Sequence, residues 1–358
     1  MFVEYKKTRD LIEKIFCKYG FSKEESREIV DAFLAADLAG IESHGIQRMI
    51  RYDDAIARGM VDVNAVPEVV FETPVSAVID ANKAMGQLVS CQAMRRAIEK
   101  AQTSGIGMVT VRNSNHFGIA GYYARMASKA GLIGMAMTNS EAIMVPTGSS
   151  QARLGTNPIA LAFPADPVDF CFDAATTVVT RGKLEVYNKA EKETPDGWII
   201  DSDGTPTNSP SKVIKNITAK AGGGILPLGG SEELTGGHKG YGYGMFCELF
   251  TSVLSGGPMS YQSYTVPNVA DTAHFFMAIN PALFGSAETI RATTSALLDD
   301  MRHSRLAEGS DRVYVHGEKE VEFAASVYEK GIPANEKTVR EIEEISKRLG
   351  IEIEGGKL

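Results

Sequence analysis

Two of the six histidines stand in sequence that suits proton transfer. His44 lies in SHGIQRMIRY, and a helix that starts there places His44, Arg48 and Tyr52 on one face, at i, i+4 and i+8. Arginine binds a carboxylate through two parallel hydrogen bonds, and imidazole exchanges a proton near neutral pH. This face therefore suits a carboxylated substrate. The alternative is an ordinary helix start, with Ser43 as the N-cap and with His44 and Arg48 in solvent.

The second histidine, His116, lies in NSNHFGIAGYYA. It follows a buried strand predicted at 105–111 and precedes a predicted helix, and loops at the carboxyl ends of α/β strands are where ligands bind. The polar residues Asn113, Ser114 and Asn115 and two glycines surround it. This composition is typical of a site, although a loop histidine without a role has the same sequence.

Two further segments favour anion or ribose binding. In FDAATT (172–177), Asp173 ends a predicted strand, where it can orient a histidine or bind a ribose hydroxyl, and the hydroxyl of Thr176 can bind phosphate. Simple helix capping is the alternative. In TGGHKGYGYGMF, Lys239 starts an apolar helix, where the helix dipole disfavours a cation. An anion bound to Lys239 and to the free backbone N–H groups removes that penalty and predicts a phosphate site; a solvated loop lysine is the alternative.

The usual nucleotide, metal and nucleophile motifs are absent from the sequence. There is no GxGxxG after a strand, no GxxxxGK[ST], no HExxH and no GxSxG. These absences disfavour a Rossmann fingerprint, a P-loop, a catalytic zinc and a nucleophile elbow, so no metal is expected.

Composition narrows the class of protein. With 37 basic and 45 acidic residues in 358, the net charge is −8, which disfavours nucleic-acid binding. The 44% hydrophobic and 23% charged content excludes a mostly disordered chain. The sequence has four scattered cysteines, an N-terminus without an apolar signal region, and no run of 18 apolar residues. We therefore expect a soluble, cytoplasmic protein without a membrane span.

The elements that position these residues alternate between helix and strand. The first sixty residues are expected to be helical, with helices at 22–39 and 44–58, and strand-like sequence follows at 66–81. The expected elements after that are helix 87–103, strand 105–111, helix 119–130, strands 132–138, 158–164 and 170–174, helix 177–192, a loop-rich stretch 194–236, helix 240–255, strand 274–280, helix 285–302, a strand and turn 313–318, and helix 335–349. This order predicts a layered α/β fold. We expect a helical N-terminal part (1–80), an α/β cofactor-binding domain (81–285), and C-terminal helices (286–358) that pack back on the N-terminal part.

Taken together and in order, the motifs resemble those of the second, non-Rossmann malate/L-lactate dehydrogenase family. That family includes sulfolactate and ureidoglycolate dehydrogenases and piperideine-2-carboxylate reductase. The matching segments are SHGIQR (43–48), NSNHFG (113–118), TNSEAIMVP (138–146), GTNPIALAFP (155–164), FDAATT (172–177), HKGYGYG (238–244), INP (279–281) and AEGSDRV (307–313). The resemblance implies a mixed sheet between helices, a cofactor bound unlike in the Rossmann unit, and a homodimer with active sites near the subunit boundary. It also implies hydride transfer between NAD(P) and a small 2-hydroxy or 2-imino acid.

The resemblance also implies roles for individual residues. His116 and His44 become the acid/base candidates, with Ser43 and Asp173 orienting His44. Arg48 becomes the clamp for the substrate carboxylate, helped by Thr156. The implied contacts to NAD, or to NADP as the alternative, are Ser140, Asp173, Ala174, Ala175, Thr176, Lys239, Glu308 and Gly309.

Several functions remain open at this point. The loop 189–235 is longer than is usual in the family, which leaves the substrate undecided among malate, lactate and ureidoglycolate types. An NADPH-dependent reductase of a cyclic imino acid or a diketo sugar acid is one alternative. A non-catalytic nucleotide-binding protein with the same fold is another, which the two histidines and Arg48 disfavour.

Overall fold

A seven-stranded mixed sheet organises the molecule. The computed structural model describes residues 1–263, 265–266 and 268–358. The strand order is β2-β3-β4-β10-β5-β6-β7, and of the neighbouring pairs only β3 and β4 run parallel. The strands are β2 (Glu68–Glu72), β3 (Ser76–Asp80), β4 (Ile106–Ser114), β5 (Ile133–Thr138), β6 (Ile159–Phe163), β7 (Phe170–Ala174) and β10 (Thr272–Ile279). The predicted mixed-sheet α/β fold is therefore confirmed, and it differs from the mostly parallel sheet of a Rossmann domain.

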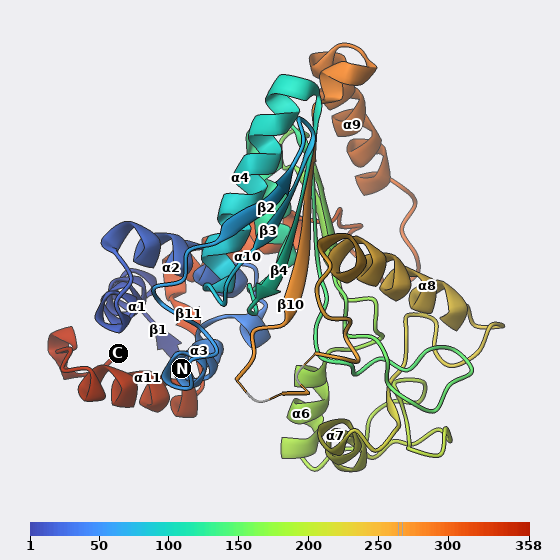
Figure 1. The fold of residues 1–358 in the computed structure, drawn as a ribbon. Helices are drawn as coiled ribbons and strands as arrows, with labels where there is room; N and C mark the ends of the chain where they lie inside the picture. Colours follow the sequence, from blue (N-terminus) through green and yellow to red (C-terminus); the bar gives the residue numbers. More distant parts are fainter. Residues whose placement is uncertain (264, 267) are drawn as a thin grey trace.

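Helices cover both faces of this sheet (Figure 1). The helices α4 (Gly86–Ser104) and α5 (Ala120–Lys129) pack on one face, and α8 (Gly237–Glu248) lies with the π-helical turn Leu249–Val253 on the other. Close packing depends on glycine in two strands. A Cβ at Gly107 would overlap the carbonyl of Ala97 in α4, and a Cβ at Gly134 would overlap that of Ala124 in α5. The sheet therefore holds α4 and α5 at backbone distance.

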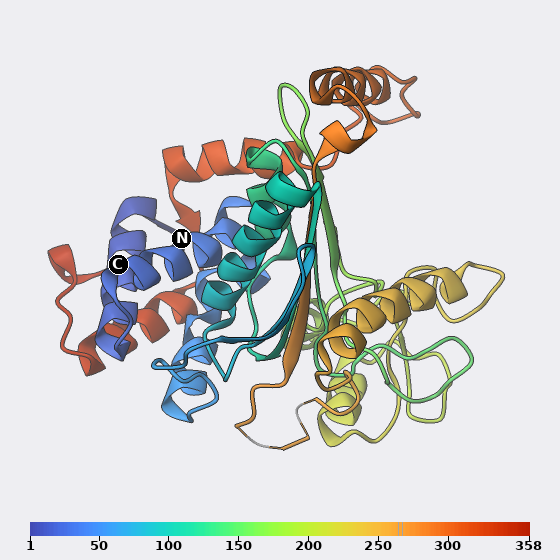
Figure 2. The same ribbon diagram turned by 45° about the horizontal axis from the view of Figure 1, so that its top comes forward.

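The two ends of the chain build one helical body beside the sheet. It contains α1 (Tyr5–Tyr19), α2 (Lys23–Leu38), α3 (Met49–Ala57), α10 (Glu318–Lys330) and α11 (Glu336–Arg348), with β1 (Phe2–Val3) paired to β11 (Ile332–Pro333). Phe16, Phe33 and Ile342 share its buried core. Figure 2 shows both termini in this body. The C-terminal helices α10 and α11 pack against the N-terminal helices α2 and α3. The boundaries at 80 and 285 stay a prediction, and the sheet also takes β2 and β3 from before residue 81.

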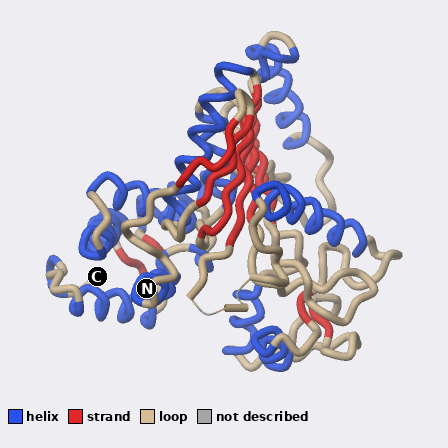
Figure 3. Tube along the Cα trace, viewed as in Figure 1, coloured by secondary structure: helices blue, strands red, loops and turns tan. Residues whose placement is uncertain are grey.

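A small lobe lies beside the lower end of the sheet in Figure 1, on the side away from the helical body. It contains α6 (Arg181–Lys189), α7 (Pro210–Ala219), and the paired β8 (Ile199–Ile200) and β9 (Gly224–Ile225). Figure 3 shows how much of this lobe is loop. The expectation of a loop-rich stretch over 194–236 did not include α7, whose Val213 and Ile217 are buried against Leu184 of α6. Polar turn residues on either side of α7 concealed this short amphipathic helix.

Three other expectations need correction. Of the strand and turn expected at 313–318, only the turn forms, at 316–317. The Val315 N–H donates to the Glu318 carboxylate at 2.9 Å, and α10 begins at Glu318. Helix 177–192 is shorter, since Thr180 caps α6 through the N–H of Lys183. Helix 44–58 becomes two 3₁₀ turns, Glu42–His44 and Ile46–Arg48, followed by α3.

The remaining helix, α9 (Ala287–Arg302), stands out from the opposite end of the sheet (Figure 2). Among the described residues, no helix is both long and apolar enough to cross a membrane.

Candidate active site

A cavity of about 440 Å³ lies where the helical body, the small lobe and the ends of the inner strands β4, β5 and β6 meet. His44, Arg48 and Tyr52 line it from the helical body, and His116 lines it from the loop after β4. Ser140 and Thr156 come from loops next to β5 and β6, and the first turn of α6 closes the far side. Five of the residues singled out from the sequence thus meet in one cavity: His44, Arg48, His116, Ser140 and Thr156.

The two histidines stack on each other. Their ring centroids are 5.5 Å apart at an interplanar angle of 29°. The Ser43 hydroxyl lies 2.8 Å from His44 Nδ1, which agrees with the orienting role implied for Ser43. Burial, together with Arg48 and Arg51, lowers the pKa of His44 to about 4. Burial, His44 and Arg48 lower the pKa of His116 well below its usual value. Both rings are therefore neutral at neutral pH.

Behind His116 lies a buried tyrosine and a buried glutamine. The Tyr52 hydroxyl is 2.7 Å from His116 Nδ1, and Gln87 Nε2 is 2.7 Å from the same hydroxyl. Tyr52 is 4% exposed and Gln87 is not exposed. The sequence placed Tyr52 on the same face as His44 and Arg48, but it did not single out Gln87, because nothing distinguishes this position from the rest of α4.

Arg48 is a cation for which the described part of the chain provides no counter-ion within ion-pair distance. Its Nε donates to the Ser43 carbonyl, and among the described residues no carboxylate forms an ion pair with it. Burial and the neighbouring Arg51 lower its pKa. A desolvated charge without a partner is costly, so an anion that enters the cavity gains a strong interaction here.

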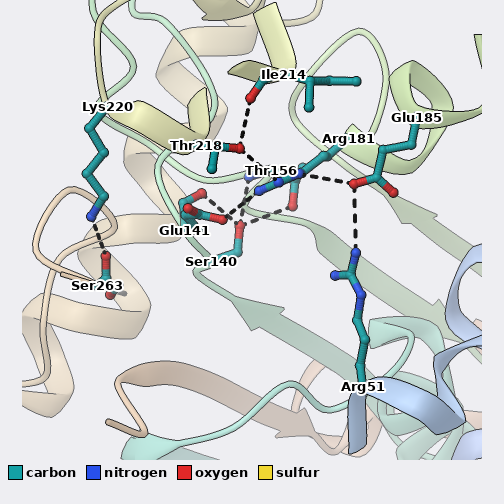
Figure 4. Close-up of polar contacts among 10 residues, drawn as sticks. All are labelled: Arg51, Ser140, Glu141, Thr156, Arg181, Glu185, Ile214, Thr218, Lys220 and Ser263. Carbon is teal, nitrogen blue, oxygen red and sulfur yellow. Dashed lines mark hydrogen bonds and ion pairs between the residues drawn. The ribbon is translucent and has the colours of Figure 1, made fainter. Parts of the chain in front are cut away.

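An ion-pair network forms the far wall (Figure 4). Arg181 Nη1 donates to Glu141 at 2.9 Å and Arg181 Nε to Glu185 at 3.2 Å. Arg51 reaches Glu185 from the helical body at 3.7 Å. Beside this wall, Ser140 Oγ accepts the Thr156 N–H at 3.1 Å. No pattern in the sequence indicated this network, because its members lie in three separate segments.

A buried carboxyl group shapes the turn that carries His44 and Arg48. Both oxygens of Asp37 in α2 accept the Ile46 N–H, at 3.2 and 2.9 Å. A Cβ at Gly45 would overlap the Asp37 carboxyl group, so this turn requires glycine. Burial, opposed by the Ile46 N–H, raises the pKa of Asp37 to about 8.

This carboxyl group makes stability depend on pH. Since the pKa is raised above its unfolded value of 3.8, the stabilising contribution is complete below about pH 4 and is lost as pH rises through 8. We expect Asp37→Asn, which keeps an acceptor for Ile46, to remove this loss, whose slope is at most about 1.4 kcal/mol per pH unit. Urea unfolding of both proteins from pH 5 to 9 measures it, and parallel curves for the two would contradict the assignment.

The other residues implied as contacts do not line the cavity. Asp173 accepts the Gly121 N–H at 2.6 Å, and among the described residues it has no hydrogen bond to His44 or His116. Burial raises its pKa to about 6. Ala174 and Ala175 follow it, partly buried. Within this one chain, the relay from Asp173 to His44 therefore has no direct contact.

Thr176 and Lys239 continue outward from the cavity. The N–H and hydroxyl of Thr176 both donate to the Thr156 carbonyl, at 2.9 and 3.0 Å. A Cβ at Gly244 of α8 would lie 3.3 Å from the Thr176 hydroxyl, and Lys239 is exposed in the first turn of that helix. Ser140, Thr156, Thr176 and Gly244 thus form a strip of neighbouring residues that reaches the middle of α8, and Lys239 lies at the start of the same helix. Glu308 and Gly309 lie apart from it, exposed in the loop between α9 and α10.

No group of three or more His, Cys, Asp or Glu side chains that could hold a metal ion occurs in the described part of the chain.

Comparison with known proteins identifies the class. The chain is 42% identical to a malate dehydrogenase of Pyrococcus abyssi, over 95% of this chain and 92% of that one. It is 32% identical to the ureidoglycolate dehydrogenase (NAD(+)) of Escherichia coli K12, over 86% and 85%. The crystal structure of malate dehydrogenase from Entamoeba histolytica superposes with a TM-score of 0.94 at 33% identity, covering 98% of each chain. This protein is therefore an oxidoreductase of the dehydrogenase class.

The particular family follows from a family model. The model described as malate/L-lactate dehydrogenase matches residues 3–343. The chain belongs to this family, as the motifs in its sequence indicated.

Proposed function

We propose that this enzyme transfers a hydride between a nicotinamide cofactor and C2 of a small 2-hydroxy carboxylic acid of the malate, lactate or ureidoglycolate type. The observation that carries the proposal is the desolvated guanidinium of Arg48, which has no carboxylate partner among the described residues, in a cavity shared with two neutral, stacked histidines. The relatives named malate and ureidoglycolate dehydrogenases support the substrate class.

The side chains then divide the work. Arg48 binds the substrate carboxylate and orients C2, with Thr156 beside it. His116 takes the hydroxyl proton during oxidation and returns it to the alkoxide during reduction. His44, oriented by Ser43, supports the substrate oxygen and is the alternative acid/base. When bound, the nicotinamide cofactor accepts or supplies the hydride.

The strip from Ser140 to α8 fits the cofactor. Hydroxyl groups of Ser140 and Thr156 lie at the cavity, and Lys239 in the first turn of α8 offers its ammonium group to a phosphate. The N–H groups of Gly236, Gly237 and Lys239 already donate to backbone carbonyls, so the side chain of Lys239 is the proposed contact. We propose NAD as the cofactor, supported by the NAD(+) in the name of the Escherichia coli relative, with NADP as the alternative. Asp173, Ala174, Ala175, Glu308 and Gly309 stay proposed contacts, carried by the resemblance alone.

Removing the charge of Lys239 tests the phosphate contact. We expect Lys239→Met to weaken cofactor binding roughly five- to tenfold, or about 1–1.5 kcal/mol, the lower end for a charged hydrogen bond because Lys239 is exposed. Fluorescence titration with NADH at two salt concentrations measures the effect, which salt should reduce. Lys220→Met, in the small lobe, is the control. An equal Kd for Lys239→Met and the wild type would leave Lys239 a solvated surface residue.

We also propose a cytoplasmic homodimer. Apolar side chains that a soluble monomer rarely groups together are exposed along α8 and the turn after it: Tyr243, Met245, Phe246, Leu249, Val253 and Leu254. The free thiols of Cys17, Cys91, Cys171 and Cys247 agree with a reducing compartment. Light scattering after size exclusion is expected to give twice the chain mass of 38.6 kDa. Phe246→Glu should reduce that mass, and a monomeric wild type would contradict the dimer.

A panel of substrates tests the proposed function directly. NADH and NADPH consumption is followed at 340 nm with oxaloacetate, pyruvate and glyoxylate, and the reverse reaction with malate, lactate and ureidoglycolate. We expect turnover of at least one 2-oxo acid that is saturable and lost when its carboxylate is amidated. Turnover of a cyclic imino acid or a diketo sugar acid alone would replace the proposed substrate class.

A further inference from the structure

A chain of two hydrogen bonds runs from the cavity into the core behind His116. It passes from His116 Nδ1 to the Tyr52 hydroxyl and on to Gln87 Nε2, with 2.7 Å at each step. The Gly118 N–H also points at His116 Nδ1, at 3.4 Å. Because Nδ1 accepts in this arrangement, the proton of the neutral ring is on Nε2.

This tautomer is the wrong one for a base. His116 lines the cavity and Nδ1 is occupied by Tyr52, so Nε2 is the nitrogen left for the substrate. A protonated Nε2 cannot take the hydroxyl proton of a 2-hydroxy acid. To take the substrate proton, His116 must have a free Nε2 and carry its own proton on Nδ1. In that tautomer the Tyr52 oxygen accepts a hydrogen bond from Nδ1–H, and the Tyr52 hydroxyl donates its hydrogen bond to another group.

Gln87 can accept a hydrogen bond from the Tyr52 hydroxyl if its side-chain amide flips, so that Oε1 and Nε2 exchange places. In the present orientation Nε2 faces Tyr52, and the buried Oε1 has no hydrogen-bond partner among the described residues. No hydrogen bond at that end of the amide therefore holds it in one orientation. After this flip, Oε1 faces the Tyr52 hydroxyl and accepts a hydrogen bond from it.

We propose that Gln87, acting through Tyr52, is a positioning residue that selects the tautomer of His116 by the orientation of its side-chain amide. The proposal rests on the proposed function, in which His116 is the acid/base. With Oε1 toward Tyr52, the Tyr52 hydroxyl donates to Gln87, Nδ1–H donates to Tyr52, and Nε2 is free. The change from the Nε2–H to the Nδ1–H tautomer releases one proton from Nε2 to solvent in the cavity and returns one from solvent to Nδ1, so the ring stays neutral.

Protons balance through the reaction. During oxidation, Nε2 takes the hydroxyl proton of the substrate as the C2–H bond gives its hydride to the cofactor, and His116 becomes an imidazolium. Nδ1–H still donates to Tyr52, whose proton still bonds to Gln87 Oε1, so the relay stays neutral and no tyrosinate forms. In reduction the same hydrogen bonds hold while Nε2–H returns its proton to the alkoxide.

Other titratable groups face His116, and none of the Gln87 and Tyr52 variants below changes them. His44 stacks on it from the 43–48 turn, and Arg48 and Arg51 approach from the same helical body. His274 lies deeper, held between the hydroxyls of Ser114 and Thr138 at 2.8 Å each. All of these groups disfavour the imidazolium form of His116. The hydrogen bonds through Tyr52 to Gln87 are therefore needed to stabilise that form during the reaction.

The tautomer is read directly by NMR of protein labelled with ¹⁵N-histidine, since the two ring nitrogens differ strongly in shift when protonated. His116→Gln identifies the signals. At neutral pH we expect Nε2–H in the wild type and in Gln87→Leu, but Nδ1–H in Gln87→Glu, whose carboxylate only accepts. Tyr52→Phe should cancel the effect of Gln87→Glu. The same tautomer in Gln87→Glu and the wild type would overturn the proposal.

Kinetics provide the second readout. Gln87→Leu removes the amide oxygen that accepts from the Tyr52 hydroxyl, so we expect kcat to fall at least tenfold with KM changed less than twofold. The pH midpoint for protonation of His116 should move down by at least one unit in Gln87→Leu and up in Gln87→Glu. Ser90→Ala, one turn further along α4, is the matched control and should leave kcat and the midpoint unchanged. If kcat falls equally in Gln87→Leu and Gln87→Glu while the pH midpoint of His116 stays unchanged in both, Gln87 has a purely structural role and the proposal is overturned.

Two outcomes separate this proposal from the proposed function. If the wild type turns over none of the panel, the proposed function fails, whereas the NMR experiment still decides the relay. If Gln87→Glu does not fold, Gln87→Leu decides, and an unchanged kcat overturns the relay.

Discussion

Replacing His116 with alanine is expected to lower kcat by at least about 100-fold in both directions, since a positioned acid/base contributes roughly 10²–10⁴-fold. The ring lies in the cavity, is neutral at neutral pH, and has its Nδ1 on Tyr52. Cofactor affinity should change little, because the proposed phosphate contacts lie on α8. Steady-state rates and an NADH titration on the same preparation measure both quantities.

A matched histidine on the surface provides the control. His303 is exposed at the end of α9, and His303→Ala should keep kcat within twofold. His44→Ala should cost less than His116→Ala, since His44 is placed in a supporting role. If His116→Ala turns over normally and His44→Ala does not, the acid/base is His44 and the stacked pair has been assigned in the wrong order.

Replacing Arg48 with methionine is expected to lower kcat/KM for the acid by at least about 100-fold. Removing one partner of a desolvated ion pair costs about 3 kcal/mol or more, because the other charge is left without compensation. Arg48→Lys keeps the charge but loses the planar pair of donors, so we expect an intermediate loss of about tenfold. Initial rates with the acid and with its amide, for each variant, measure these effects.

The substrate amide distinguishes carboxylate binding from a structural role. It lacks the charge, so Arg48→Met should affect it much less than the acid. Arg58→Met is the matched control, since Arg58 follows α3, is exposed, and pairs with Asp54. Equal losses for acid and amide would mean that Arg48 only supports the turn 43–48. A collapse of cofactor affinity would instead place Arg48 in the nucleotide site.

Local patterns in the sequence predicted the elements that carry strong periodicity. The capping box of Ser22 and Glu25 is present at the start of α2, and each buried strand from 105 to 174 formed within a few residues of its expected limits. Elements decided by distant contacts were missed or misplaced. The 43–48 turn avoids a single helix because Asp37 binds the Ile46 N–H, and no local rule contains that contact.

The candidate site divides in the same way. Residues in polar, glycine-flanked segments, such as His44 and His116, could be found because their surroundings are unusual for a core or a surface. Arg181 and Gln87 stand in ordinary helical sequence, and only the fold brings Arg181 to the cavity and Gln87 to the Tyr52 hydroxyl behind it. Their roles depend on partners far along the chain, which spacing alone does not reveal.

The helical body that joins the two chain ends has a consequence for synthesis on the ribosome. Roughly 260 residues separate the end of α3 from the start of α10, and bacterial and eukaryotic ribosomes need about 10–50 s to add them at about 5–20 residues per second. During that interval Phe16, Phe33 and their neighbours have no C-terminal partner to cover them. The nascent N-terminal helices therefore expose apolar side chains during this interval, and the helical body that carries His44 and Arg48 is completed only when α10 and α11 have been added.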